Sequence, residues 1–135
     1  MEARIRIVGI IIQDEKLLMV KGKGYSELWT PGGTLEGGEN DEECLRRELK
    51  EETNGNLLSA KFFREYNGHS FYHPEKKLIE RVYVSMMDGE IKPDPNSEIE
   101  SIIWFTKNDF KNKKFPMITH TETELIPDII KAGIW

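Results

Sequence analysis

The chain has 135 residues, long enough for a substantial hydrophobic core, and it predicts a single domain over residues 1–135. Its net charge of −5 argues against a nucleic-acid polymer as the main partner, because proteins that bind one usually carry a basic face. The single cysteine excludes an internal disulfide, and no signal-peptide pattern or membrane-length apolar run is present, so we expect a cytoplasmic protein without a membrane partner.

Two strands and a tight turn are the first elements that the sequence predicts. Residues 4–13 are rich in β-branched side chains, and their continuous apolar run favours a strand covered on both faces. Asp14 and Glu15 form the turn, and residues 16–21 return as the second strand. A glycine-rich segment, residues 22–33, comes next. Its glycines could let the backbone approach a phosphate, but alone they fit a flexible turn equally well.

A helix with both ends marked follows this loop. Asn40 is a good N-cap, and Glu43, three residues on, can reach back to complete a capping box. Residues 41–53 contain no glycine or proline and consist mostly of strong helix formers. Asn54 and Gly55 then end the helix, because both tolerate the left-handed conformation.

This helix gathers carboxylates beside the face that we expect to be buried. At about 100° per residue, Glu48 and Glu52 share one row with Cys44, and Glu51 lies beside it. Acids at the rim of a core repel one another, and Arg47, which can pair with Glu51, cannot serve all three. An all-oxygen cluster predicts Mg²⁺ or Mn²⁺ rather than zinc, and Cys44 without a partner is interpreted as a small buried residue.

The spacing of these residues resembles that of a known family. Gly33, five residues, Glu39, seven residues and then the run from Arg47 to Glu52 is similar to the Nudix box. Asn54 and Gly55 stand where the box normally has Gly and an aliphatic residue, and Asn can supply the left-handed geometry.

The resemblance implies a Nudix-type α/β/α sandwich, of the α/β (α+β) class, with a mixed, largely antiparallel sheet between helices. It implies a hydrolase of nucleoside diphosphates linked to another group. The catalytic and metal-binding roles fall on Glu48, Glu52 and the Gly32 carbonyl, with Glu51 as a further ligand or the general base. A salt bridge between Glu39 and Arg47 is expected to tie the loop to the helix, and Gly33 is expected to be structural.

The rest of the chain predicts three more strands and a terminal helix. The strands cover residues 57–66, 78–87 and 99–106, and a polar, aromatic loop spans residues 67–76. Residues from Asp109 onward are ambiguous. A helix over residues 121–132 is expected to be interrupted at Pro127.

Several residues outside the box are candidates for binding the substrate or a metal. Trp104 is expected to pack in the core instead, and the two loop histidines lack further metal ligands at suitable spacing. Glu98 is predicted to complete the metal site as a fourth acid, with Glu100 and then Glu80 as alternatives. The candidates for phosphate contacts are Lys21, Lys23 and Arg64, and those for stacking a base are Trp29, Phe71 and Tyr72.

Three functions remain open from the sequence. We favour a metal-dependent diphosphatase acting on a small nucleotide substrate, such as a nucleoside triphosphate, a nucleotide sugar or a dinucleotide. The alternatives are an RNA 5′-end pyrophosphohydrolase, which the acidic charge disfavours, and a non-catalytic nucleotide sensor, which would have no need of all the box carboxylates. The sequence leaves open whether the protein forms a homodimer.

Overall fold

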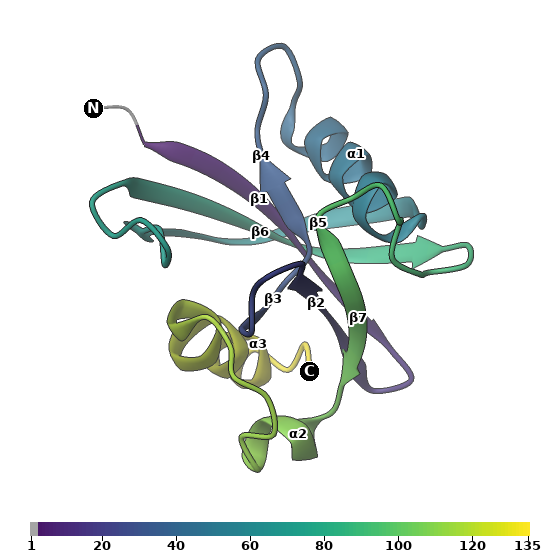
Figure 1. Ribbon diagram of the computed structural model, residues 1–135, viewed down its shortest axis with the longest axis vertical. Coiled ribbons are helices and arrows are strands. Elements are labelled where there is room, and N and C mark those ends of the chain that lie inside the picture. Colours follow the sequence, from purple (N-terminus) through teal and green to yellow (C-terminus); the bar gives the residue numbers. More distant parts are fainter. Residues whose placement is uncertain (1–2) are drawn as a thin grey trace.

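The computed structural model describes residues 3–135 (Figure 1). No helix in this range is both long enough and apolar enough to span a membrane. In chain order the elements are β1 (Arg4–Gln13), β2 (Lys16–Gly22), β3 (Leu28–Trp29), β4 (Gly32–Thr34), α1 (Asp41–Thr53), β5 (Asn56–His69), β6 (Lys77–Asp88), β7 (Ile99–Phe105), α2 (Lys107–Lys111), the π-helical turn η1 (Thr121–Leu125) and α3 (Ile126–Lys131).

The strands form one mixed sheet centred on β1. Its main path runs β3-β2-β1-β6-β5, while β4 pairs with β1 and β7 pairs with β2. β1 and β6 are parallel, with Arg6 opposite Glu80 and Val8 opposite Val82, and the other pairings between strands are antiparallel. β1 therefore lies inside the sheet, as its continuous apolar run predicts.

Helices cover both faces of this sheet (Figure 1). On one face Leu45 and Leu49 of α1 pack with Ile7 and Ile11 of β1. On the other face η1 and α3 pack against the alternate residues of β1 and β2, including Val8. Successive strand residues point to opposite faces, so one apolar strand supplies two cores. The expected α/β/α sandwich of the α/β (α+β) class is confirmed.

The best-marked elements lie where the sequence predicts them. β1 and α1 have the predicted bounds. Asp14 and Glu15 both have positive φ angles, 50° and 65°, which is the backbone of a two-residue hairpin turn.

Two predictions about the flanking elements are wrong, and some short elements were not predicted. β5 continues to His69, through the first residues of the predicted loop, because its pairing with β6 extends to Lys77. The short strands β3 and β4 and helix α2 were not predicted. The C-terminal helix is not broken at Pro127, which lies in the first turn of α3, where a proline costs no intrahelical hydrogen bond.

Candidate active site

Local capping fixes the helix that carries the acids. The Asn40 side chain accepts a hydrogen bond from Glu43 N at 2.8 Å, and Glu43 Oε1 accepts one from Asn40 N at 3.0 Å, which completes the predicted capping box. At the other end Asn54 adopts the left-handed conformation, with a φ of 61°. Both ends of α1 are therefore set by its own sequence.

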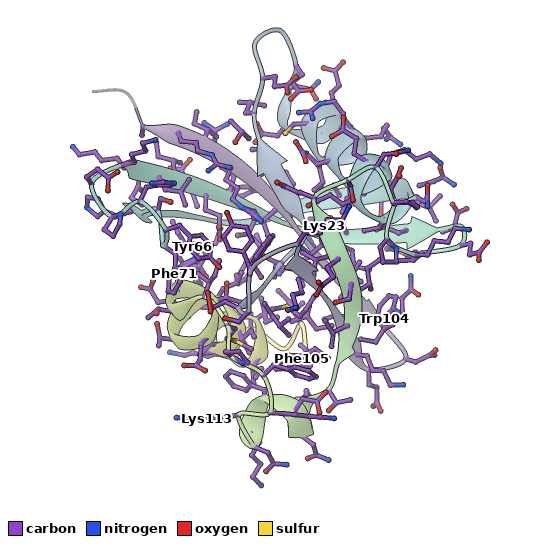
Figure 2. The ribbon with its side chains drawn as sticks, viewed as in Figure 1. Lys23, Tyr66, Phe71, Trp104, Phe105 and Lys113 are labelled. Atoms are coloured by element: carbon purple, nitrogen blue, oxygen red, sulfur yellow. The ribbon has the colours of Figure 1, made fainter. Side chains whose placement is uncertain are left out.

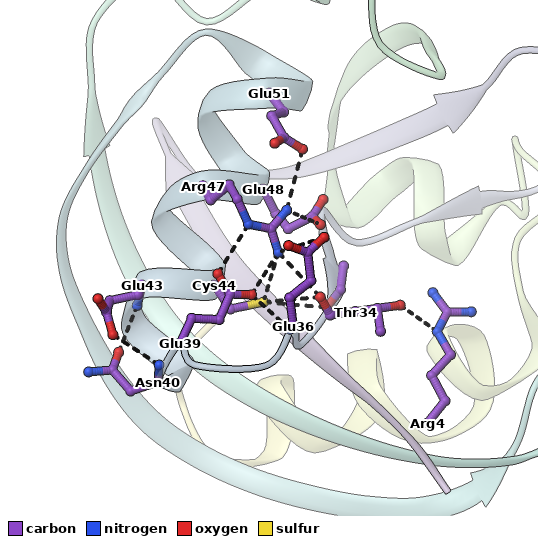
Figure 3. Close-up of polar contacts among 11 residues, drawn as sticks. Arg4, Thr34, Glu36, Glu39, Asn40, Glu43, Cys44, Arg47, Glu48 and Glu51 are labelled. Carbon is purple, nitrogen blue, oxygen red and sulfur yellow. Dashed lines mark hydrogen bonds and ion pairs between the residues drawn. The ribbon is translucent and has the colours of Figure 1, made fainter.

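Arg47 joins the loop before α1 to the carboxylates on it (Figure 3). Its Nη2 donates to Glu39 Oε1 at 2.7 Å and its Nη1 donates to Glu48 Oε1 at 2.8 Å. The Nη1 atom lies 3.5 Å from Glu51 Oε2, and Nη2 lies 3.8 Å from Glu36 Oε1. Arg47 thus contacts Glu48 and Glu51 but not Glu52, so the expectation that one guanidinium cannot serve all three acids of the helix is confirmed.

The ion pair between Arg47 and Glu39 is unusually favourable. The pair is bidentate, because Nε also donates to Glu39 Oε2 at 3.1 Å alongside the bond from Nη2. These bonds and one from the Glu36 N–H hold the pKa of Glu39 at about 2. Burial, with a smaller effect of the Glu39 carboxylate, raises the pKa of the Cys44 thiol to about 12, so that thiol is unreactive at neutral pH.

Glu52 is the most deeply buried acid of α1. It lies in the last turn of α1, and only 3% of the residue is exposed. Its Oε1 accepts a hydrogen bond from Gly32 N at 3.0 Å. Burial raises the pKa of Glu52 to about 8, although the positive charge of Arg6 and this hydrogen bond oppose the rise. Burial likewise raises the pKa of Glu48 against the opposing effect of Arg47.

Two glycines of β4 bring the backbone close to these acids. A methyl group added at Gly33 would lie 2.1 Å from Glu48 Cδ, so only glycine leaves room for this carboxylate. Gly32 has a φ of 150°, and a methyl group there would lie 2.0 Å from the carbonyl oxygen of Ile7 on β1. Strand β4 thus passes directly between β1 and the acidic row of α1.

The donor set of this region fits a hard divalent cation. Glu52 Oε2 makes no hydrogen bond within residues 3–135, and the charges of Glu48 and Glu98 both raise the Glu52 pKa further. A bound cation would relieve this repulsion and the cost of the buried charge. In residues 3–135, no three His, Cys, Asp or Glu side chains converge closely enough to hold a metal ion, and Glu48 Oε1 accepts a hydrogen bond from Arg47 Nη1. A cation bound at Glu48 Oε1 would have to compete with Arg47 for that oxygen.

A pocket of about 600 Å³ opens beside the acids. Glu48, Glu98, Gly32 and Gly33 line it on the side of α1. All three residues predicted to stack a base also line it, namely Trp29, Phe71 and Tyr72. Tyr25 joins them, with its ring centroid 4.7 Å from that of Tyr72. Figure 2 shows Phe71 beside Tyr66, on the side of the molecule that holds α3 and away from Trp104.

Other candidate residues lie away from this pocket. Lys21 pairs with Glu100, Lys23 donates to the carbonyl oxygen of Pro95, and Arg64 pairs with Asp128. None of the three lines the pocket, and neither does Glu100. Glu51, with 58% of its side chain exposed, points to solvent beside Arg47. Trp104 packs against the core under α1, as expected.

Sequence reasoning missed Arg4, Arg6 and His120, and it named Glu80 only as a third choice for the fourth metal-binding acid. Arg4 and Arg6 line the pocket from β1, and Glu80 and His120 line it from β6 and the start of the C-terminal helix. The two arginines alternate in a strand and therefore share one face, a signal that was present in the sequence. No sequence signal joins Glu80 to His120, which come together only through the fold.

A model of the family described as NUDIX domain matches residues 3–128 of the chain. No curated protein matches this chain. Among solved structures, a NUDIX hydrolase from Nitrosomonas europaea superposes with a TM-score of 0.81 at 23% identity, covering 98% of this chain and 90% of that one.

Two other similar structures have more specific names. A UDP-X diphosphatase has a TM-score of 0.78 at 20% identity, covering 98% of this chain and 65% of that one. A bifunctional NMN adenylyltransferase/ADP ribose pyrophosphatase from Francisella tularensis, complexed with AMP and a Mn ion, has a TM-score of 0.74 at 21% identity. The match covers 97% of this chain and 42% of that one. At these identities the similarity establishes a shared fold.

Proposed function

Since the chain belongs to the NUDIX family and is a Nudix hydrolase, we propose that it hydrolyses the diphosphate linkage of a small nucleoside diphosphate derivative with Mg²⁺ or Mn²⁺. One observation carries this proposal: Glu48, from the acidic row of α1, lines a pocket together with aromatic rings. The names of two similar structures, a UDP-X diphosphatase and an ADP ribose pyrophosphatase, support the same substrate class.

We assign the metal ligands to the acids around the β4 backbone. Glu48, Glu52, Glu98 and the Gly32 carbonyl would hold the cation, with Glu51 as a further ligand or the general base. When bound, the cation neutralises the diphosphate and lowers the pKa of a bound water. The Mn ion in the F. tularensis structure is consistent with this choice of metal.

The remaining residues prepare this site. Arg47 fixes the loop through Glu39 and restrains Glu48 until a stronger cation competes for that carboxylate. The rings of Trp29, Phe71 and Tyr72 offer surfaces on which a base can stack, which contributes about 1–3 kcal/mol per base. The pocket volume of about 600 Å³ suits a small molecule rather than a polymer.

A substrate screen tests the proposal. Nucleoside triphosphates, nucleotide sugars and dinucleotide polyphosphates are incubated with the protein and Mg²⁺, and the products are identified by mass spectrometry. We expect hydrolysis of at least one substrate at the diphosphate, loss of turnover in excess chelator and recovery on adding Mg²⁺ or Mn²⁺. Full activity in chelator would refute the metal assignment, and no turnover of any substrate would favour a nucleotide sensor.

A further inference from the structure

The part of the pocket formed by β1 and β6 holds two charged groups that are not assigned as metal ligands. Arg6 on β1 and Glu80 on β6 are direct partners in the parallel pairing of these strands, and both line the pocket. Yet neither a hydrogen bond nor an ion pair joins them within residues 3–135, where each makes its contacts elsewhere. A cation and an anion therefore stand side by side with unused hydrogen-bonding capacity.

The Arg6 guanidinium has N–H groups without hydrogen-bond partners. Its Nη2 donates to the carbonyl oxygen of Thr30 at 2.7 Å, the one hydrogen bond that the guanidinium makes in the described chain. Its Nη1 is the single buried side-chain nitrogen or oxygen without a partner in residues 3–135. Leaving such a donor unmet costs about 1–3 kcal/mol, and a ligand acceptor that engages the guanidinium would recover part of it.

Glu80 is the matching acceptor. Only 8% of the residue is exposed, and Oε1 lies 3.2 Å from His120 Nε2, while Oε2 makes no hydrogen bond within residues 3–135. The other ring nitrogen of His120, Nδ1, lies 2.6 Å from Glu124 Oε2. With a carboxylate at each nitrogen, a protonated imidazole would donate to both, and its contact with Oε1 leaves Oε2 of Glu80 free to accept.

We propose that Arg6 and Glu80 read the edge of the substrate's base, and that this base is guanine. The guanine edge presents the O6 acceptor, then the N1–H donor and the exocyclic amino donor. Arg6 matches O6, and an acceptor-only carboxylate matches two adjacent donors. Adenine, cytosine and uracil each offer only one donor position on this edge. Trp29 and Phe71 line the same pocket and supply stacking surfaces.

This inference rests on the proposed nucleotide substrate but is tested without hydrolysis. Binding of GMP, IMP, AMP, CMP and UMP is measured by calorimetry in Mg²⁺. IMP differs from GMP only in lacking the exocyclic amino group. We expect GMP to bind about tenfold or more tightly than IMP, since a hydrogen bond to a charged group is lost, and the other three to bind more weakly still.

Variants of Glu80 and of Arg6 test the two proposed contacts with the base separately. Glu80→Gln should bring the affinities for GMP and IMP to within about twofold of each other, since its amide no longer accepts both donors. Glu80→Asp, which keeps the charge but shortens the reach, should also reduce this preference, and so guards against a folding defect in the first variant. Arg6→Gln should weaken GMP and IMP alike, because both carry O6. The matched control is Glu65→Gln, an exposed acid of β5 that pairs with Arg81 outside the pocket and should bind like wild type.

The inference is overturned by equal affinity for all five nucleotides, by a GMP preference that survives in both folded Glu80 variants, or by no binding of GMP at millimolar concentration. Failure of the proposed function gives a different pattern, in which no diphosphate is hydrolysed while GMP is still selected. Base-independent binding with active hydrolysis would remove the guanine assignment and leave the diphosphatase intact.

Discussion

Replacing Glu52 with Gln should stabilise the metal-free protein while it destroys activity. The carboxylate is 3% exposed, and burial raises its pKa to about 8, against an ordinary value of 4.5. Below pH 4.5 the group is protonated in both the folded and the unfolded chain and has no effect. As the pH rises from 4.5 to 8, the unfolded chain ionises first, so the wild type loses stability over this range.

The size of the effect follows from the shift. At pH 7, about 2.5 units above the ordinary value, the loss is about 3 kcal/mol, because each unit corresponds to about 1.4 kcal/mol. The Gln side chain can keep the hydrogen bond from Gly32 N, but its new amino group needs an acceptor, which costs about 1–2 kcal/mol if none is found. We therefore expect Glu52→Gln to gain about 1–2 kcal/mol at pH 7.

Urea unfolding in excess chelator measures this difference at several pH values. At pH 5 the loss in wild type is only about 0.7 kcal/mol, less than the cost of the new amino group, so Glu52→Gln should be slightly less stable there; the difference should become a gain as the pH rises and level off above pH 8. Glu51→Gln is the control, because 58% of the Glu51 side chain is exposed and its removal should show little pH dependence. Equal stability of Glu52→Gln and wild type at every pH, or a variant that is weaker at pH 8, would contradict the electrostatic account.

Four further predictions follow from the same geometry. Activity of Glu52→Gln should fall by orders of magnitude while Lys50→Gln, an exposed neighbour, stays near wild type in a steady-state assay; near-normal turnover of Glu52→Gln would refute its role. Gly33→Ala should lose most activity, because its methyl group displaces Glu48, whereas Gly37→Ala, which meets nothing within 4 Å, should keep it; equal kinetics would remove the steric argument. Asn54→Gly should be close to neutral and Asn54→Val should cost about 1–2 kcal/mol in urea unfolding, because φ is positive there; variants of equal stability would contradict the cap. Mg²⁺ should raise the melting temperature of wild type more than that of Glu52→Gln, and an equal rise in both would place the cation elsewhere.

Local signals made part of this molecule predictable from its sequence. The caps at Asn40 and Asn54 lie within a few residues of the helix ends that they define, so the bounds of α1 follow from neighbouring residues. The pairing of Arg47 with Glu39 could be predicted only from the resemblance to a family, because a spacing of eight residues across a loop does not by itself indicate a contact. The resemblance thus added a contact that periodicity could not supply.

Features that depend on tertiary packing were not predictable. Pro127 resembles a helix breaker, but η1 continues directly into α3 and Pro127 lies in the first turn of α3, where its missing N–H is harmless. Lys21 and Lys23 lie near the glycine loop in sequence, yet Lys21 pairs with Glu100 and Lys23 bonds to Pro95 because β2 pairs with β7. The alignment of Arg6 with Glu80 likewise depends on the parallel register of β1 and β6.

Hydrolysis in ¹⁸O-labelled water is the most direct test of the central claim, that the acids of α1 direct water to a phosphorus of a diphosphate. With Mg²⁺ and a substrate found by the screen, mass spectrometry should detect one ¹⁸O atom in one of the two phosphate-containing products. The label should disappear in excess chelator and in Glu52→Gln. Incorporation of ¹⁸O at a carbon-bound hydroxyl, or labelled product in chelator, would contradict the account.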